Sequence, residues 1–360
     1  MTLVATLFWS CQKMVEFDTD QVASQLVLNS LPSDGQRLFL NFAYSRFFLT
    51  DQPGPAASSP DIKISVNNGS LILVPDSVAG SNYFFPYTPV AGDSLAVTIN
   101  AEGHLVTAST RIPKPLQISN IRYYQVWDQS MHSVAKAIDS SLNFCIISFD
   151  LADPAEEDNY YYVRISERDS GEVYSSRHSR FEKVDTVYPR SMFMCDDPKV
   201  VGDDVRLSAP VVELPGGYTP YDCIICSDKA ISGTNHRIAL YLPILVDTNE
   251  AAGFIHQFTL HVESINADRV KYLLGVSSAT GLASAFAEPA GVYSNVTVDG
   301  EPGLGLFSGI SHRSYPIEIT PWPYPQNLSK ITYGMSPFRA GSDLMYKIYS
   351  IKKQYVTRKM

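Results

Sequence analysis

The chain lacks the sequence signatures of the common catalytic classes. No GxSxG nucleophile elbow is present, and no GK[ST] follows the glycines of residues 303–309 to make a phosphate loop. The carboxylates of residues 150–158 lack the Asp-x-Asp-x-Asp-Gly order of a calcium loop. We therefore predict a non-catalytic protein with no metal ion and no cofactor. A catalytic Ser/His/Asp triad remains an alternative, because its three residues meet only in the folded structure and have no fixed spacing in the sequence.

Cysteine is scarce, with five residues in 360, which is too few for a disulfide-dense scaffold. With Cys11 set aside, Cys145, Cys195, Cys223 and Cys226 would allow two bridges in an oxidising compartment, and the sequence does not choose the pairing. The last two form a CxxC motif. The two isoleucines between them favour a strand, which would point the thiols to opposite faces. No second CxxC completes a zinc site. We predict buried thiols or one bridge.

Charged residues are also few, at 18% of the chain, and the net charge is −9. An acidic protein is repelled by the phosphate backbone, so we predict no nucleic-acid partner. Basic side chains are concentrated in residues 326–360, which we interpret as a solvated tail or last strand. A contact of this segment with anionic lipid or an acidic partner is the alternative.

No apolar run near the N-terminus is long enough to span a bilayer, which takes about 20 residues. Residues 1–10 are apolar and precede Cys11, as at the end of a lipoprotein signal. We interpret residues 1–24 as a signal remnant, a lipidated Cys11 and a polar tether. The alternative is an ordinary apolar N-terminus with a free thiol. No basic segment comes first, so either the signal is truncated or Met1 is an internal residue.

Strand-forming and turn-forming residues fill the rest of the chain, including 21 Tyr and 23 Pro. In residues 25–113 short strands recur about every 8–12 residues, and Asn68-Gly69 and Glu102-Gly103 mark hairpin turns. The predicted fold class is mainly β, and this part is predicted to be an immunoglobulin-like β-sandwich.

Residues 114–325 are predicted to form a larger β-rich domain with one or two short helices. The best helix candidate is residues 264–279, and a second is residues 134–138. His256 and His261 are five apart on a predicted strand, so we expect them on opposite faces. Residues 288–309 are predicted to form a strand, a glycine-rich turn and a second strand. We expect this hairpin to close the sheet of the second domain.

The candidate ligand-contacting residues are aromatic, because exposed Tyr and Trp stack on sugar rings or anchor interfaces. Trp322 and Tyr324 lie between prolines on a predicted loop, and Phe85 and Tyr87 lie in the first domain. Positions in the cores are the alternative, since aromatic residues favour strands.

Two other classes of function are open to the sequence. A hydrolase could use paired carboxylates, such as Asp150 with Asp153 or Asp196 with Asp197, and would need a pocket that raises the pKa of one of them. An adhesin or fibre subunit built by strand addition would need a donor, for which residues 330–360 are the candidate.

Several segments, taken in their order, resemble one known family: SQLVLNSLPSDGQRLFLNFAYSR, HLVTASTRIPKPLQI, ISFDLADPAEEDNYYYVRI, CSDKAISGTNHRIALYL, HVESINADRVKYLLGV and EPAGVYSNVTVDGEPGLGLFSG. From about Cys11 to Ser311 the chain is similar to the uncharacterised Bacteroidota envelope lipoproteins grouped as domain of unknown function 4249. The resemblance implies an outer-membrane lipoprotein, facing the periplasm or the cell surface. It also implies an accessory or ligand-binding partner of a TonB-dependent transporter. It brings no established catalytic or ligand residues.

Overall fold

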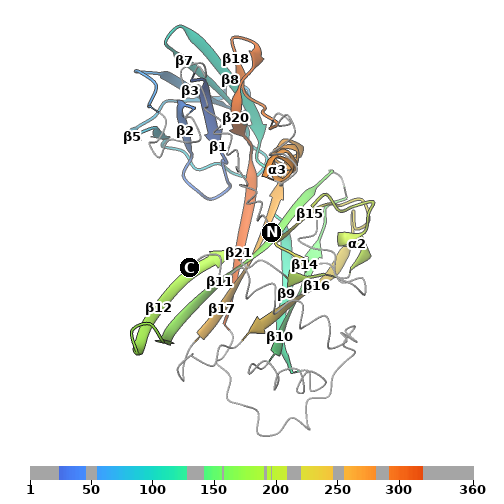
Figure 1. The fold of residues 1–360 in the computed structure, drawn as a ribbon. Helices are drawn as coiled ribbons and strands as arrows, with labels where there is room; N and C mark the ends of the chain where they lie inside the picture. The colour runs from blue at the N-terminus through green and yellow to red at the C-terminus, as the bar shows by residue number, and fades with distance from the viewer. Residues whose placement is uncertain are drawn as a thin grey trace, which may run out of the picture.

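The computed structural model describes residues 24–45, 55–127, 142–155, 158–189, 193–195, 197–208, 220–245, 255–280 and 292–318. Within these residues the chain is mainly β, as predicted, and forms several antiparallel sheets with two helices. Figure 1 shows two lobes, and each lobe has its own hydrophobic core. No helix in this part of the chain is long and apolar enough to cross a membrane.

The N-terminal lobe is a two-sheet sandwich. Its first eight strands are β1 (Leu26–Ser30), β2 (Phe39–Tyr44), β3 (Asp61–Val66), β4 (Leu71–Leu73), β5 (Ser77–Ala79), β6 (Asn82–Phe84), β7 (Ser94–Ala101) and β8 (His104–Arg111). One sheet contains the order β1-β2-β6-β5, and the other contains β8-β7-β3-β4. In immunoglobulin letters these are A-B-E-D and G-F-C-C′, so the predicted immunoglobulin-like sandwich is confirmed.

Alternation along the strands builds the core of this lobe. In β7 every second side chain, from Leu95 to Ala101, is buried, and the intervening ones are exposed or half-buried. The predicted hairpin turns are also present. Asn68 and Gly69 have φ of 58° and 89°, and Glu102 and Gly103 have φ of 53° and 88°. These positive values match the right-handed twist of the flanking strands.

The C-terminal lobe is a second sandwich. Its strands are β9 (Gln117–Trp127), β10 (Leu142–Ala152), β11 (Tyr160–Ser175), β12 (Arg180–Pro189), β13 (Phe193–Met194), β14 (Pro220–Tyr221), β15 (Cys223–Ser227), β16 (Asn235–Leu245), β17 (Ile255–Ile265) and β21 (Ile310–Glu318). One sheet contains β9-β10-β16-β13, and the other contains β21-β17-β11-β12. This is again the A-B-E-D and G-F-C-C′ order, so the two lobes repeat one topology.

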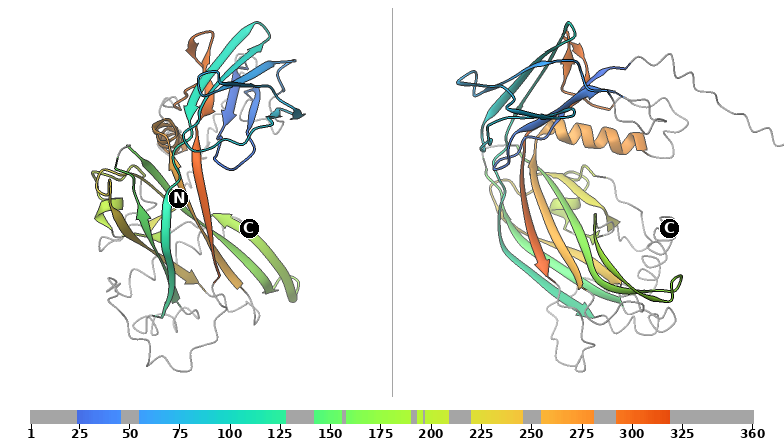
Figure 2. Two further views of the ribbon diagram at one scale, coloured as in Figure 1. Left: turned by 180° about the vertical axis from the view of Figure 1, so that it is seen from behind. Right: turned by 90° about the vertical axis from the view of Figure 1, so that its left-hand side faces the viewer.

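Two helices accompany the C-terminal lobe: α2 (Pro198–Val201) and α3 (Ala267–Thr280). The helix predicted at residues 264–279 is therefore confirmed as α3. Its Val270 packs with Ile225, Ile265 and Ile310 in a small separate core. Figure 2 shows α3 lying between the two lobes. The second predicted helix, at residues 134–138, lies outside the described residues.

The return segment, which we define as residues 292–309, belongs to the N-terminal lobe. Its strands are β18 (Thr297–Val298), β19 (Glu301–Pro302) and β20 (Leu304–Phe307). β18 pairs with β8, and β20 runs parallel to β1. The expectation that this hairpin closes the sheet of the second domain is therefore wrong. Its Asp299-Gly300 turn is present, with φ of 54° and 86°, but its partner strands come from the start of the chain.

The lobes are joined by hydrogen bonds and by an ion pair. The chain runs from β20 almost directly into β21 and stays beside β1, where the N–H of Ile310 donates to Pro32 over 2.9 Å. The side-chain amide of Asn266, just before α3, donates to the carbonyl of Arg111 over 2.8 Å. Arg313 of β21 pairs with Asp34 over 2.6 Å. The return segment thus leads the chain from one core into the other (Figure 1).

Candidate functional site

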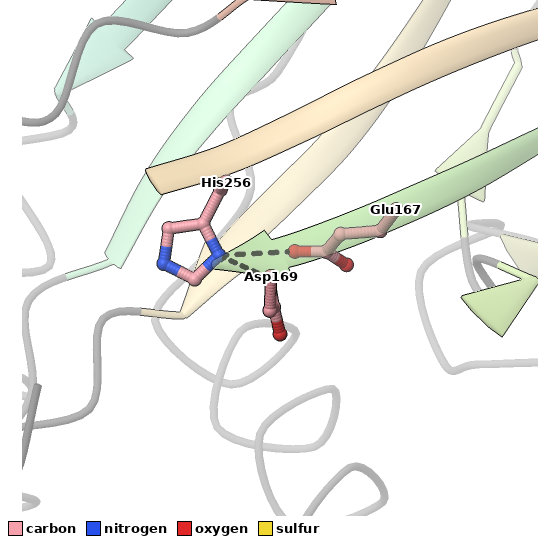
Figure 3. Close-up of side chains that lie close together, drawn as sticks. All are labelled: Glu167, Asp169 and His256. Carbon is pink, nitrogen blue, oxygen red and sulfur yellow. Dashed lines mark hydrogen bonds and ion pairs between the residues drawn. The ribbon is translucent and has the colours of Figure 1, made fainter. Parts of the chain in front are cut away.

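Three ionisable side chains converge on the core-facing side of the sheet that contains β11 and β17. Glu167 and Asp169 are alternate residues of β11 and continue the row of Val163 and Ile165, which are core residues. His256 lies directly opposite Asp169 in the β11–β17 register, so its side chain emerges on the same face. Figure 3 shows the imidazole ring beside the two carboxylates. We call this group the His–carboxylate cluster.

The cluster is closely spaced and largely buried. The Nδ1 atom of His256 lies 2.8 Å from Asp169 Oδ1 and 3.2 Å from Glu167 Oε1. The hydroxyl of Tyr188, on β12, donates to Asp169 Oδ2 over 2.5 Å. Glu167 is only 1% exposed. A buried carboxylate is costly unless it is paired, so the cluster must hold either a proton or a cation between its members.

Sequence reasoning missed this cluster because its members are distant in the chain. Glu167 and Asp169 show the i, i+2 spacing of one strand face, but His256 comes 87 residues after Asp169. Only the pairing register of β11 with β17 brings it there. The prediction that His256 and His261 face opposite sides is confirmed, since His261 Nε2 lies 2.8 Å from Ser166 Oγ, on the other face of the sheet.

The predicted ligand-contacting aromatics do not meet at one site in the described residues. Phe85 is fully buried in the N-terminal core, which contradicts a ligand-contacting role and fits the alternative of a core position. Tyr87 packs on the same core and donates to Asp93 over 2.6 Å. Burial and this hydrogen bond raise the pKa of Tyr87 to about 12. Trp322, Tyr324 and Cys11 lie outside the described residues.

The carboxylates of the hydrolase hypothesis are held by structural partners. Arg237 donates two hydrogen bonds, of 2.6 and 2.9 Å, to the carboxylate of Asp150. Together with Asn120 it lowers the pKa of Asp150 to about 2. Asp153 accepts the N–H of Gly233 over 2.9 Å, and burial raises its pKa.

In the second pair, Asp196 lies outside the described residues. Asp197 caps α2 by accepting the N–H of Lys199 over 3.0 Å and lies 2.6 Å from His236. Asp197 therefore caps the start of α2 and also has a histidine as a partner.

The CxxC segment forms a strand, β15, as predicted, and its thiols point to opposite faces. Cys226 lies in the main core of the C-terminal lobe with Cys195, whereas Cys223 packs on the small core beneath α3. Cys223 and Cys226 are not joined in a disulfide. Burial raises the pKa of both Cys223 and Cys226 to about 12, which disfavours the thiolate that redox chemistry needs.

A cavity of about 340 Å³ lies where the lobes meet. Arg111 and Lys114 line it from the interlobe connection, and Asp158 and Asn266 line it from the C-terminal lobe. Neither Asp150 nor Asp153 lines this cavity, so it does not supply the pocket that the hydrolase hypothesis requires.

These features define a two-lobed protein of tandem immunoglobulin-like sandwiches with a His–carboxylate cluster. The chain belongs to the family described as a domain of unknown function (DUF4249), whose match spans residues 12–315. The resemblance of the sequence to domain of unknown function 4249 is thereby confirmed. No curated protein matches the chain. Among solved structures, the crystal structure of collagen adhesin (CNA) from S. aureus is similar at 9% identity. That match covers 82% of this chain and 94% of the other, with a TM-score of 0.16.

Proposed function

We propose that the protein is a non-catalytic accessory or binding protein of the cell envelope. In this proposal a lipid on Cys11 anchors it to the outer membrane, and it serves a TonB-dependent transporter. The observation that carries the proposal is the architecture: two immunoglobulin-like sandwiches joined as one unit by the return segment. Such sandwiches present loops and strand edges to partners on a firm scaffold.

The environment of Asp150, which sequence reasoning offered to a hydrolase, supports a non-catalytic role. Asp150 is kept ionised by Arg237, and its two oxygens are taken up by hydrogen bonds. A general acid needs a carboxyl group that holds its proton near neutral pH, and a pKa of about 2 removes Asp150 from that role.

An exposed sheet edge supports partner binding. β12 stands at the end of its sheet order and extends beyond the body of the C-terminal lobe (Figure 1). Its Phe181 and Val187 are 55% and 65% exposed, which is high for apolar side chains. Open edges and exposed apolar residues are places where proteins add a partner strand or bury a partner surface.

Native co-purification tests the proposal. The tagged full-length protein is extracted in mild detergent, and co-purifying membrane proteins are identified by mass spectrometry. We expect a TonB-dependent transporter in the eluate. Val187→Lys should lower its recovery, because a charge on an edge strand opposes pairing. Val90→Lys is the matched control, since Val90 is 58% exposed on the other lobe. Consistent absence of any transporter would refute the partnership.

Anchoring is tested separately through the thiol of Cys11. Metabolic labelling with a palmitate analogue should mark the wild type, and Cys11→Ala should abolish the label and release the protein from the membrane fraction. Unlabelled wild-type protein, or a labelled Cys11→Ala variant, would refute the lipid anchor.

A further inference from the structure

The donor atoms of the His–carboxylate cluster stand at the spacing of a metal coordination sphere. Metal–ligand bonds of about 2.1 Å place neighbouring donors about 3.0 Å apart at right angles and about 3.4 Å apart at tetrahedral angles. His256 Nδ1 lies 2.8 Å from Asp169 Oδ1 and 3.2 Å from Glu167 Oε1, and all three atoms lie within 4.8 Å of one another. An ion would therefore need little movement of these strands.

The charge of the cluster also favours a divalent cation. Two carboxylates and a protonated imidazole sum to −1, at a place where Glu167 is almost fully buried. With a divalent cation and a neutral imidazole the charges of the three ligands and the ion sum to zero, which suits a largely buried position. The proton on Nδ1 then leaves to solvent, and Nε2 keeps its own proton.

The surroundings of the cluster hold one ligand in place. Tyr188, on β12, donates its hydroxyl to Asp169 Oδ2 and leaves Oδ1 turned to the imidazole. Outer partners of this kind orient ligands and tune their affinity. The four side chains come from three adjacent strands, β12, β11 and β17, and strands position ligands more firmly than loops do.

We propose that Glu167, Asp169 and His256 bind one divalent transition-metal ion, with Zn²⁺ the preferred ion. An imidazole ligand suits zinc and its neighbours, whereas Ca²⁺ takes six to eight oxygen ligands, more than these side chains offer. Three protein ligands leave a coordination position for water or for a group of a bound partner. This site goes beyond the proposed accessory function and does not depend on it.

Calorimetric titration of the full-length, chelator-treated protein tests the site. ZnCl₂ should bind at about one ion per chain with a Kd below about 10 μM, and CaCl₂ should give no binding at that concentration. Glu167→Gln and His256→Asn should each weaken Zn²⁺ binding at least about tenfold, and Tyr188→Phe about tenfold through loss of the outer hydrogen bond.

A second histidine–carboxylate pair provides the matched control. His178 Nδ1 lies 2.7 Å from Glu182 Oε1 on the exposed β11–β12 hairpin, with a single carboxylate. His178→Asn should leave Zn²⁺ affinity unchanged. If His178→Asn weakens binding as much as His256→Asn does, the ion is bound by surface histidines and the proposal is overturned.

Thermal unfolding of the wild type gives a readout that needs no variant. An ion that binds only the folded chain stabilises it by RT ln(1 + [ion]/Kd), so Zn²⁺ should raise Tm and Ca²⁺ should not. The absence of both binding heat and a Tm shift with Zn²⁺ would overturn the proposal. So would undiminished Zn²⁺ binding by a folded Glu167→Gln or His256→Asn protein.

Discussion

Replacing Gly305, a half-buried residue of β20, by alanine should destabilise the N-terminal lobe. Gly305 has a φ of 111°, and a Cβ atom there would overlap the carbonyl of Leu28 on β1. The backbone strain costs about 1–3 kcal/mol. The added Cβ atom also moves β20 away from β1, which weakens about two hydrogen bonds worth about 0.5–1.5 kcal/mol each. We expect Gly305→Ala to lower the free energy of unfolding by about 2–6 kcal/mol in total.

Urea denaturation followed by circular dichroism measures this loss. For a slope of about 1–3 kcal/mol/M, the midpoint should fall by at least about 0.7 M. Gly300→Ala is the matched control in the same segment, with a φ of 86° and no atom within 4 Å of its added Cβ. It should cost only about 1 kcal/mol. Equal midpoints for the two variants would refute the close pairing of β20 with β1.

Other predictions concern side chains of the C-terminal lobe. Arg269 Nη2 lies 2.8 Å from Glu263 Oε2, and Arg164 Nε lies 3.7 Å from Oε1 of the same carboxylate. Arg269→Met should cost about 2–3 kcal/mol by leaving this buried carboxylate with only the more distant Arg164; a urea midpoint within error of the wild type would contradict this. Burial, with Arg164 and His312 nearby, lowers the pKa of His261 to about 4. Unfolded histidine titrates near pH 6.5, so the unfolded chain binds the extra proton between about pH 6.5 and 4, and stability should fall as the pH drops through that window. His261→Gln should flatten the dependence in urea titrations, and an unchanged slope would exclude this cause. Because burial raises the pKa of Cys226 to about 12, we expect it to react with maleimide only after unfolding, and native labelling located by mass spectrometry would disprove its burial.

Short sequence patterns were sufficient to predict the turns, a strand and the main helix. Asn68-Gly69 and Glu102-Gly103 predicted turns because few residue pairs accept positive φ, and both turns have it. The same reasoning found the Asp299-Gly300 turn. The two isoleucines of the CxxC segment predicted strand β15, and the helix predicted at residues 264–279 is α3.

Pairing between distant segments was not accessible to the same reasoning. Asp299 accepts the N–H of Leu105, 194 residues earlier. The sequence of residues 288–309 does not predict that partner. The His–carboxylate cluster could not be predicted for the same reason. Two carboxylates at i and i+2 on a strand indicate a site only when the pairing register places His256 opposite them. The pairing register of two strands depends on which side chains the two complete sheets bury. A local sequence pattern does not determine this.

The return segment has a consequence for the order in which the protein is built. The strands next to it, β1 and β8, are synthesised near the start of the chain, yet their partners β20 and β18 arrive near residue 300. The first lobe to leave the ribosome is therefore not completed until about residue 307, when most of the C-terminal lobe has already been made. Until then β1 and β8 present open edges, which are sites for aggregation or chaperone binding, and such long-range pairing folds slowly. A fragment cut after residue 113 would keep those edges permanently, so the N-terminal lobe is a poor unit to express alone.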